Sequence, residues 1–496
     1  MKRVISFTLL LCMLLCAASC GGADAPAADD TMADSTADVQ TEPDVSLREN
    51  TPDTLPDDLD FGGAKVRIAV NGSEAVMTRE VGLEETNGDV VNDALYHRRR
   101  SVEERLNVKL DYLATAAETA DFREAVRTTL TAGDDAYDIV IAHQSFGLPQ
   151  ALEGLYHNLA DAPYLDYSQP WWNTGYMSSI EITEDSRYML AGDICSTFLL
   201  NMGSVFFNKS LYEDNFGDPM ALYQTALDGN WTLDHLMKLC SDVSRDLDQN
   251  GTFEVTDVLG MYASTVTTAD LFAYAAGLTL TERDADGLPQ LKADQSRNVT
   301  VMEKLKTLYY ETPGIVLATK DATLLAEGVQ TFVGGTALFF PERFSRMLAL
   351  REMKDLYGIL PYPKVDTQQK EYRTTVHDYT TLFSVPITVA DIDMSCAVLE
   401  ALCAESYRTV IPAWYETALK VKFTHDDISA QVIDLIYENA AADFMYANNY
   451  YFSSAKLGTI QRTILGSNGE YMSQYASMEE SVKALLAKLI SETTGA

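Results

Sequence analysis

Apolar and polar positions along the chain follow two different periods, and their alternation predicts strands interleaved with helices. The expected order at the start of the folded part is strand 65–70, helix 92–106, strand 108–113, helix 121–132 and strand 137–142. Short runs rich in β-branched residues are typical of strands, whereas apolar residues three and four positions apart are typical of amphipathic helices. Strands that alternate with helices favour a parallel α/β sheet.

One run, residues 202–208 (MGSVFFN), is almost entirely apolar and runs into a polar Asn-Lys-Ser turn. Such a run predicts a strand that is buried on both faces. The α/β pattern continues after it. Further elements are expected as a helix capped by Thr232, a helix at 297–310, strands at 336–343, 357–363 and 380–386, a helix at 391–406, and a final helix that opens with a capping box of Ser477 and Glu480.

Length and charge limit the kind of protein. A chain of 496 residues exceeds what one hydrophobic core usually sustains, so two lobes are expected. The net charge is −36, from 73 acidic and 37 basic residues. So acidic a surface repels phosphate backbones and gains nothing from counterion release, which excludes nucleic acid as a partner.

The first 20 residues resemble a bacterial lipoprotein signal. Lys2 and Arg3 precede an apolar segment (4–15) that is too short to span a membrane, and Ala-Ala-Ser then stands directly before Cys20. The resemblance implies that Cys20 carries lipid and becomes the mature N-terminus, which anchors the protein at the outer face of the bacterial membrane. The alternative is a plain secretory signal that is cleaved nearby.

Residues 21–60 predict a disordered tether. They contain twelve acidic residues and one basic residue, Arg48, and show no apolar period. Such a composition cannot bury enough apolar surface to offset the entropy of ordering.

Four cysteines remain after the signal and Cys20. Cys396 and Cys403 are seven residues apart in a helical pattern, which places their Cα atoms roughly 10.5 Å apart, whereas a disulfide needs roughly 4.4–6.8 Å. No cysteine cluster has zinc spacing. We expect all four to be buried small hydrophobic residues: Cys195, Cys240, Cys396 and Cys403.

The strongest local motif is a calcium loop at residues 246–257. Oxygen-bearing side chains at positions 1, 3, 5, 9 and 12 and glycine at position 6 match the loop of EF-hands, except that aspartate replaces glutamate at the last position. The stretch after the loop looks extended, so no second helix is expected. The predicted ligands of a structural Ca²⁺ are Asp246, Asp248, Asn250, Thr252 and Asp257. The alternative is a solvated turn, and Asp284-Ala-Asp286-Gly287 is a weaker match that favours a hairpin turn.

Several segments in order along the chain resemble bacterial extracellular solute-binding proteins of the sugar-binding type (family 1). These segments are FNKSLYED (207–214), GGTALFF (334–340), YGILPYPK (357–364), VPIT (385–388) and IPAWYETALK (411–420). The resemblance implies an α/β, two-lobed periplasmic-binding-protein-like fold (type II) with the ligand in a cleft between lobes joined by crossing strands. The expected parts are a signal peptide (1–20), the tether (21–60), a first lobe (61–202 and 364–395), a hinge strand crossing between the lobes (203–208) and a second lobe (209–363 and 396–496).

Sugars present flat C–H faces that stack on aromatic rings, and hydroxyl groups that carboxylates and arginines bind. Trp171 and Trp172 lie in an irregular stretch, and the pair is either a core plug or a binding platform with at least one ring on the ligand. Trp231 is expected to pack before a helix N-cap. By the resemblance, the remaining ligand-binding candidates are Asp193, Glu342, Arg343, Asp378, Tyr379 and Trp414. For the polar candidates the alternative is a surface ion pair or a loop cap.

The resemblance implies a monomeric, lipid-anchored protein that captures a carbohydrate, most simply an oligosaccharide, for the separate permease subunits of an ABC importer. No nucleophile elbow, zinc-protease motif, Walker loop or C-x-x-C motif indicates an enzyme. Two alternatives remain open. One is a surface glycoside hydrolase or lyase, and the other is a glycan-binding or sensor lipoprotein without a transport role.

Overall fold

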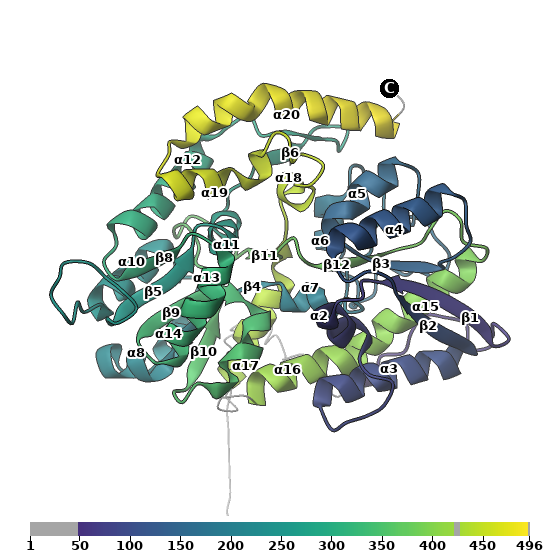
Figure 1. Ribbon diagram of the computed structural model, residues 1–496, viewed down its shortest axis with the longest axis horizontal. Coiled ribbons are helices and arrows are strands. Elements are labelled where there is room, and N and C mark those ends of the chain that lie inside the picture. The colour runs from purple at the N-terminus through teal and green to yellow at the C-terminus, as the bar shows by residue number, and fades with distance from the viewer. Residues whose placement is uncertain (1–47, 421–426, 495–496) are drawn as a thin grey trace, which may run out of the picture. The chain divides into compact units, whose positions relative to one another are not determined.

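The computed structural model describes residues 48–420 and 427–494, which fold as a mixed α/β protein with two separate main sheets (Figure 1). None of the helices within these ranges combines the length and the apolar character that a membrane-spanning helix needs.

The first lobe is the four-stranded sheet and the helices packed on it. Its strands are β1 (Ala64–Val70), β2 (Val108–Ala114), β3 (Ile139–His143) and β12 (Thr381–Ser384), in the order β12-β3-β1-β2. β1 pairs in parallel with β2 and β3, whereas β12 is antiparallel to β3. Successive residues of β1 enter two different core clusters, which follows from the period of two along a strand. The sheet is therefore buried on both faces.

The second lobe is built on a five-stranded sheet in the order β10-β4-β9-β5-β8. Its strands are β4 (Gly203–Asn208), β5 (Leu259–Ser264), β8 (Ile315–Ala318), β9 (Ala337–Arg343) and β10 (Tyr357–Leu360). β5 is parallel to β8 and β9, and β4 is antiparallel to both β9 and β10. The run that the sequence predicts as a doubly buried strand is confirmed, because every residue of β4 is buried.

The other elements have the following bounds. The helices are α2 (Glu74–Val76), α3 (Val90–Leu106), α4 (Thr119–Thr131), α5 (Gln144–Leu152), α6 (Thr174–Ile180), α7 (Ser196–Leu200), α8 (Lys209–Phe216), α9 (Met220–Leu227), α10 (Leu233–Val243), α11 (Thr267–Ala275), α12 (Ser296–Lys306), α13 (Asp321–Thr323), α14 (Val329–Val333), α15 (Ile392–Glu405), α16 (Ile411–Lys420), α17 (Asp427–Glu438), α18 (Phe444–Ala447), α19 (Ile460–Ser467) and α20 (Tyr471–Thr494). The short π- or 3-10-helical segments are η1 (Met77–Val81), η2 (Thr307–Glu311), η3 (Leu324–Gly328), η4 (Phe344–Glu352), η5 (Ser406–Val410) and η6 (Leu457–Thr459), and the short strands are β6 (Thr281–Arg283), β7 (Pro289–Leu291), β11 (Thr374–Thr375) and β13 (Ala440–Ala441).

The two sheets share one strand order. In each, the first strand of a parallel trio lies in the middle (β1, β5), the second lies at an edge (β2, β8), and the third (β3, β9) pairs with an antiparallel strand (β12, β4). β12 follows the second lobe in the sequence, and β4 follows the first. Each antiparallel strand is therefore the first strand after the chain has changed lobes.

The chain changes lobes before β4 (the first crossing) and again before β12 (the second crossing), and these two crossings lie beside each other. Met202 and Val376 form an antiparallel bridge, and the backbone N–H of His377 donates to the carbonyl oxygen of Asn201 at 2.9 Å. The prediction of 203–208 as the hinge strand is therefore wrong in its position. β4 lies wholly within the second sheet, and the chain changes lobes one or two residues earlier.

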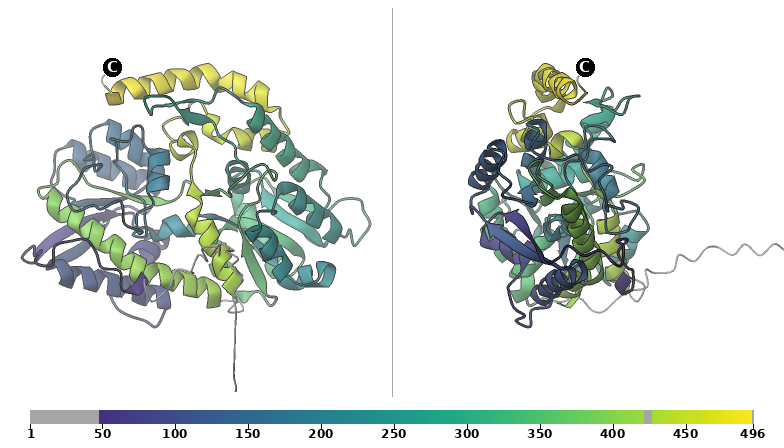
Figure 2. Two further views of the ribbon diagram at one scale, coloured as in Figure 1. Left: turned by 180° about the vertical axis from the view of Figure 1, so that it is seen from behind. Right: turned by 90° about the vertical axis from the view of Figure 1, so that its right-hand side faces the viewer.

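The boundary of the second lobe is also corrected. Helices α15 and α16 pack on α3 of the first lobe, so residues 396–420 do not belong to the second lobe as expected. Helix α17 returns to the second lobe and packs on β10 and α9. The last helices, α19 and α20 (yellow in Figures 1 and 2), pack on α12, which lies in the second lobe.

The N-terminal end of the described chain is packed, although residues 21–60 were expected to be a disordered tether. The side chain of Leu55 is 5% exposed. The Thr54 hydroxyl donates to Glu400 at 3.1 Å, and Arg105 donates to the carbonyl oxygens of Leu55 and Pro56. One buried leucine and these side-chain bonds hold a segment whose overall composition predicts disorder.

Most predicted elements are confirmed to within a few residues, including the helix capped by Thr232, whose hydroxyl accepts from the N–H of His235. The start of the final helix is wrong. Helix α20 begins at Tyr471, and Ser477 lies inside it, where its hydroxyl donates to the carbonyl oxygen of Gln474. The buried rings of Tyr471 and Tyr475 extend the helix before the expected capping box.

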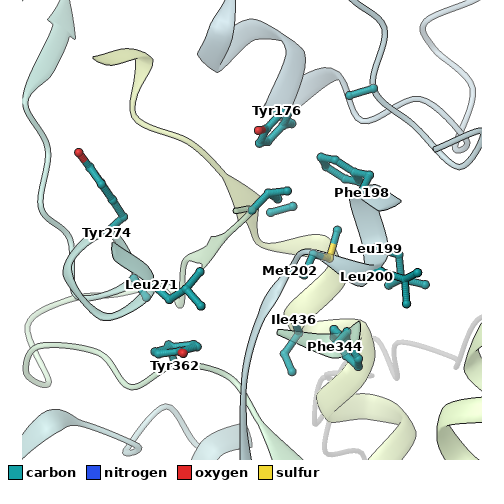
Figure 3. Packing of buried hydrophobic residues seen from close by; sticks show 14 of the residues in the cluster. Tyr176, Phe198, Leu199, Leu200, Met202, Leu271, Tyr274, Phe344, Tyr362 and Ile436 are labelled. Carbon is teal, nitrogen blue, oxygen red and sulfur yellow. The ribbon is translucent and has the colours of Figure 1, made fainter. Parts of the chain in front are cut away.

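Hydrophobic residues near the crossings form a continuous core (Figure 3). Phe198 of α7 and Tyr176 of α6 belong to the same buried cluster as Leu271 of α11 and Ile436 of α17. The core therefore runs from one lobe into the other. The four cysteines expected to be buried and unbridged are all free and buried.

Candidate functional site

Four of the predicted ligand residues lie near the crossings. Glu342 and Arg343 are the last residues of β9 and pair with Ser204 and Gly203 of β4. Asp378 and Tyr379 follow the second crossing and directly precede β12. Asn201 joins the two groups of residues. Its carbonyl oxygen accepts from the N–H of His377, and its side-chain oxygen lies 3.4 Å from Nη1 of Arg343.

Glu342 is a buried carboxylate that serves two guanidinium groups. It accepts from Nε of Arg343 and Nε of Arg346, each at 3.0 Å. Burial by itself raises the pKa of Glu342, but the two arginines outweigh it and hold the pKa below its usual range. With its oxygens occupied and its side chain 1% exposed, Glu342 fixes the positions of the two arginines.

Asp378 fixes the segment between the second crossing and β12. Its carboxylate lies 3.1 Å from Nδ1 of His377 and accepts from the amide of Asn449 at 2.9 Å. Burial and the nearby Arg343 lower the pKa of His377 to about 4, so the imidazole is neutral near pH 7. Asp378 thereby ties the loop after α18 to the crossing and leaves Tyr379 to project outward.

Tyr379 belongs to a continuous row of rings that we call the aromatic face: Tyr379, His143, Phe146 and Tyr450. Successive ring centroids in this row are each 5.3 Å apart. Tyr379 is 65% exposed and Tyr450 is 39% exposed, although both are large aromatic residues. The Arg123 guanidinium lies 5.1 Å from the ring centroids of Phe146 and Tyr450. Exposed rings held in this way offer flat apolar surfaces next to a cation.

Most of the aromatic face was missed by sequence reasoning. His143 directly follows the predicted strand at 137–142, and a polar residue after a buried strand is a usable signal. Tyr450 gave no such signal, because it lies in an irregular segment more than 300 residues from its neighbour Phe146. Arg346 lies one helical turn beyond Glu342 and was also missed.

The two adjacent tryptophans are core residues, which corrects the expectation that at least one of them contacts the ligand. Trp171 is 0% exposed and Trp172 is 5% exposed. Both indole N–H groups donate to Glu400 of α15, at 3.2 and 2.9 Å. Burial raises the pKa of Glu400 to about 7 even though four donors face it.

Asp193 and Trp414 are buried as well. Asp193 is 2% exposed and accepts from the hydroxyl of Tyr437 of α17, so its carboxylate is enclosed. Burial raises its pKa to about 7. Trp414 lies in α16 on the α3 side of the first lobe and is 5% exposed. Its family-based assignment is corrected, because α16 covers the first lobe.

The predicted calcium loop has a geometry that fits a cation. Carboxylate oxygens of Asp246, Asp248 and Asp257 lie within 4.8 Å of one another. Oxygens bound at about 2.4 Å around one ion are at most about 4.8 Å apart. Gly251 has φ 86°, which supplies the turn, and the backbones of Arg245 and Val258 pair across the ends of the loop. Strand β5 follows in place of a second helix, as expected, and Asp284–Gly287 is a hairpin turn between β6 and β7.

The signal peptide (1–20), the lipidation site Cys20 and most of the tether lie outside the described residues.

No family model and no curated protein matches this chain. Solved structures do match. A sugar transporter from Rhizobium etli, in an open conformation, aligns with a TM-score of 0.56 at 14% identity, over 85% of this chain and 100% of that one. The GacH receptor of Streptomyces glaucescens, studied unliganded and with acarbose, gives a TM-score of 0.54 at 12% identity, over 86% and 99% of the two chains. A cyclo/maltodextrin-binding protein in complex with maltotetraose gives 0.54 at 12% identity, over 86% and 97%.

These likenesses extend over nearly the whole of each matched protein. They establish the fold of this chain as the two-lobed fold of ABC-transporter solute-binding proteins, which confirms the fold expected from the sequence. The matched proteins are a receptor, a sugar transporter and a binding protein.

Proposed function

We propose that this protein captures a carbohydrate outside the cell and delivers it to the permease subunits of an ABC importer. The observation that carries the proposal is the exposed aromatic face beside the crossings, where Tyr379 and Tyr450 keep large rings in water. Exposed aromatic rings of this kind mark a binding surface. The fold, which this chain shares with proteins that bind acarbose and maltotetraose, supports the same function.

The aromatic rings and the arginine donors bind different parts of a sugar. The rings stack on the C–H faces of sugar units, and the donors of Arg346 bind hydroxyl or acidic groups. Tyr379 precedes β12 of the first lobe, Tyr450 lies on the segment after α18, and β9 belongs to the second lobe. A rotation of the lobes at the crossings therefore changes the distance between the rings and β9. Closing of the lobes around the sugar excludes water from these contacts.

A thermal-shift screen of the purified protein against mono- and oligosaccharides tests the proposal. A sugar at 100 times its Kd is expected to raise the free energy of unfolding by about 2.7 kcal/mol. The proposal requires that the sugar is recovered unchanged. Release of shorter products would replace it with a surface hydrolase or lyase, and absence of any shift would remove carbohydrate as the ligand.

Replacement of Tyr379 or Tyr450 by alanine is expected to weaken sugar binding about tenfold each. The loss of one stacked ring costs about 1–1.5 kcal/mol, which is close to a factor of ten in Kd. Isothermal titration of each variant measures the effect, with Tyr310→Ala as a matched control, since Tyr310 is 43% exposed in η2 of the second lobe. Affinities within twofold of the wild type for both variants would contradict the role of the aromatic face.

We also propose that Cys20 carries lipid and holds the protein at the outer face of the membrane as a monomer. The order of the positive, apolar and small residues before Cys20 supports this assignment. Cys20→Ala is expected to release the protein from the membrane fraction into the medium or periplasm. Retention of the variant in washed membranes would contradict it.

We further propose that the loop at 246–257 binds a structural Ca²⁺. Three carboxylates converge here, one of them on the buried Asp257, and a cation bound between them binds the folded chain more tightly than the unfolded one, so the ion stabilises the fold. Saturating Ca²⁺ is expected to raise the free energy of unfolding by about 2.7 kcal/mol at 100 times Kd, and a chelator to reverse it. Asp246→Asn is expected to abolish the effect, and Asp284→Asn in the β6–β7 turn is the matched control. A stability that does not change with chelator would contradict the site.

A further inference from the structure

Three arginines from both lobes surround the short helix α7 at the first crossing. Helix α7 contacts η1 of the first lobe and η4 of the second lobe. Arg79 lies in η1, Arg346 lies in η4, and Arg343 directly precedes η4 and lies 3.4 Å from Asn201 at the end of α7. Segments of both lobes that carry these arginines therefore meet at α7.

The contact between the lobes at this point brings like charges together. Arg79 is partly buried, and burial together with the positive charges of Arg346 and Arg343 lowers its pKa. Across residues 48–420 and 427–494, no carboxylate lies within 4.0 Å of the Arg79 guanidinium and no hydrogen bond holds it. Arg79 is thus a partly desolvated cation on which burial and the charges of Arg346 and Arg343 outweigh the attraction of Glu80.

The nearby acids are engaged elsewhere. Glu80 accepts from the N–H groups of Ser196 and Thr197 and from the Thr381 hydroxyl. Asp321 accepts from the N–H of Thr267 and from Ser264. These contacts fix both carboxylates on the protein backbone and hydroxyls.

Glu342 is shared by Arg343 and Arg346, so one negative charge serves two positive ones. Arg346 uses only its Nε on Glu342, and within the described chain its two terminal amino groups have no hydrogen-bond partner. Its side chain is 23% exposed. The donors of Arg346 and Arg79 are therefore open to a ligand.

We propose, resting on the function proposed above, that the ligand is an acidic oligosaccharide whose anionic group lies between Arg79 of the first lobe and Arg346 of the second. An anion at this place is attracted by both arginines and offsets the repulsion between them. Closure of the lobes then depends on the charge of the sugar. Guanidinium groups bind carboxylates and sulfates through paired N–H donors. A protein of net charge −36 repels an anionic sugar elsewhere on its surface, so such a ligand needs a local cationic site.

The test uses isothermal titration of the purified protein with trigalacturonate, with a sulfated chondroitin disaccharide and with neutral maltotriose. At least one acidic sugar is expected to bind, more weakly at 0.5 M than at 0.05 M sodium chloride. Arg79→Gln and Arg346→Gln are each expected to weaken that binding at least tenfold, and Arg79→Lys to restore part of it. Arg127→Gln is the matched control, because Arg127 pairs with Glu153 on an exposed part of α4.

The acidic sugar that binds distinguishes a carboxylate ligand from a sulfate ligand. Binding of maltotriose alone, unchanged in Arg79→Gln, overturns this inference and leaves the proposed carbohydrate function intact. Binding of an acidic sugar that both glutamine variants retain within twofold overturns it as well. If no sugar binds, the proposed carbohydrate function falls. The anion site between the arginines falls with it if inorganic sulfate stabilises the wild type no more than Arg79→Gln at equal ionic strength.

Discussion

Replacement of Glu342 by glutamine is expected to lower the free energy of unfolding by about 3–5 kcal/mol. The substitution keeps the shape of the side chain but removes the one negative charge that serves Arg343 and Arg346. Arg343 is 8% exposed, so its guanidinium would be left in the interior without a counter-charge. Removal of one partner from a buried ion pair costs this much because the remaining charge stays desolvated.

Urea unfolding at pH 7 measures the effect of Glu342→Gln. The control is Asp242→Asn, which removes one partner of an exposed pair with Lys238, and its cost is expected to stay below about 1 kcal/mol. A cost for Glu342→Gln as small as that of the control would contradict the importance of the buried pair.

Asp193 is expected to make the protein less stable as the pH rises from 4 to 7. Its pKa in the folded state is about 7, compared with the ordinary 3.8, because burial disfavours the charged form. Between these two values the folded state binds the proton and the unfolded state does not. The stability contributed by this proton is fully present below about pH 4, is lost as the pH rises to about 7, and amounts to about 2–4 kcal/mol.

The comparison of the wild type with Asp193→Asn separates the contribution of the Asp193 proton to stability from that of all other titrating groups. The variant keeps an oxygen that accepts from Tyr437 but has no charge to bury. Its stability relative to the wild type is expected to increase by about 2–4 kcal/mol between pH 4.5 and pH 8. Asp161→Asn is the control for the loss of a charge, because Asp161 is an exposed loop residue. A relative stability that stays constant over this range would refute the assignment.

The strands were predictable because their signals are local. The run at 203–208 consists of small or apolar residues up to Asn208, and a short run of this kind bounded by turn residues favours a strand that is buried on both faces. The same local signal could not place the hinge. Whether the chain changes lobes before or within β4 depends on its pairing with β9 and β10, strands that lie more than 130 residues later in the sequence.

The tryptophan pair shows why site residues are harder to predict than strands. An indole in an irregular stretch needs a partner for its N–H and cover for its rings, and a core and a sugar both supply these. The partner of Trp171 and Trp172 is Glu400, over 220 residues away, so the sequence near the pair could not decide. Only the fold brings α15 beneath the pair.

Four of the predicted residues, Glu342, Arg343, Asp378 and Tyr379, lie near the crossings because they adjoin strands there. Arg343 ends β9 and Asp378 precedes β12, and the ends of strands that adjoin the crossings lie close together. Tyr450 and Arg79 do not follow a strand, and their partners are distant in the sequence. The sequence could therefore indicate residues near the crossings but not the rings and the cation that we add to the proposed site.

The packing of residues 48–60 determines where a mechanical load enters the protein. Arg48 lies 4.4 Å from the ring centroid of Tyr407, and Arg408 donates to the carbonyl oxygen of Thr51 at 2.8 Å. Tension on the preceding chain is therefore resisted by the first lobe, and it reaches the second lobe only through the crossings and the core beside them. If the proposed anchor at Cys20 holds the protein, the first lobe is the part that is held, and closure moves the second lobe relative to it.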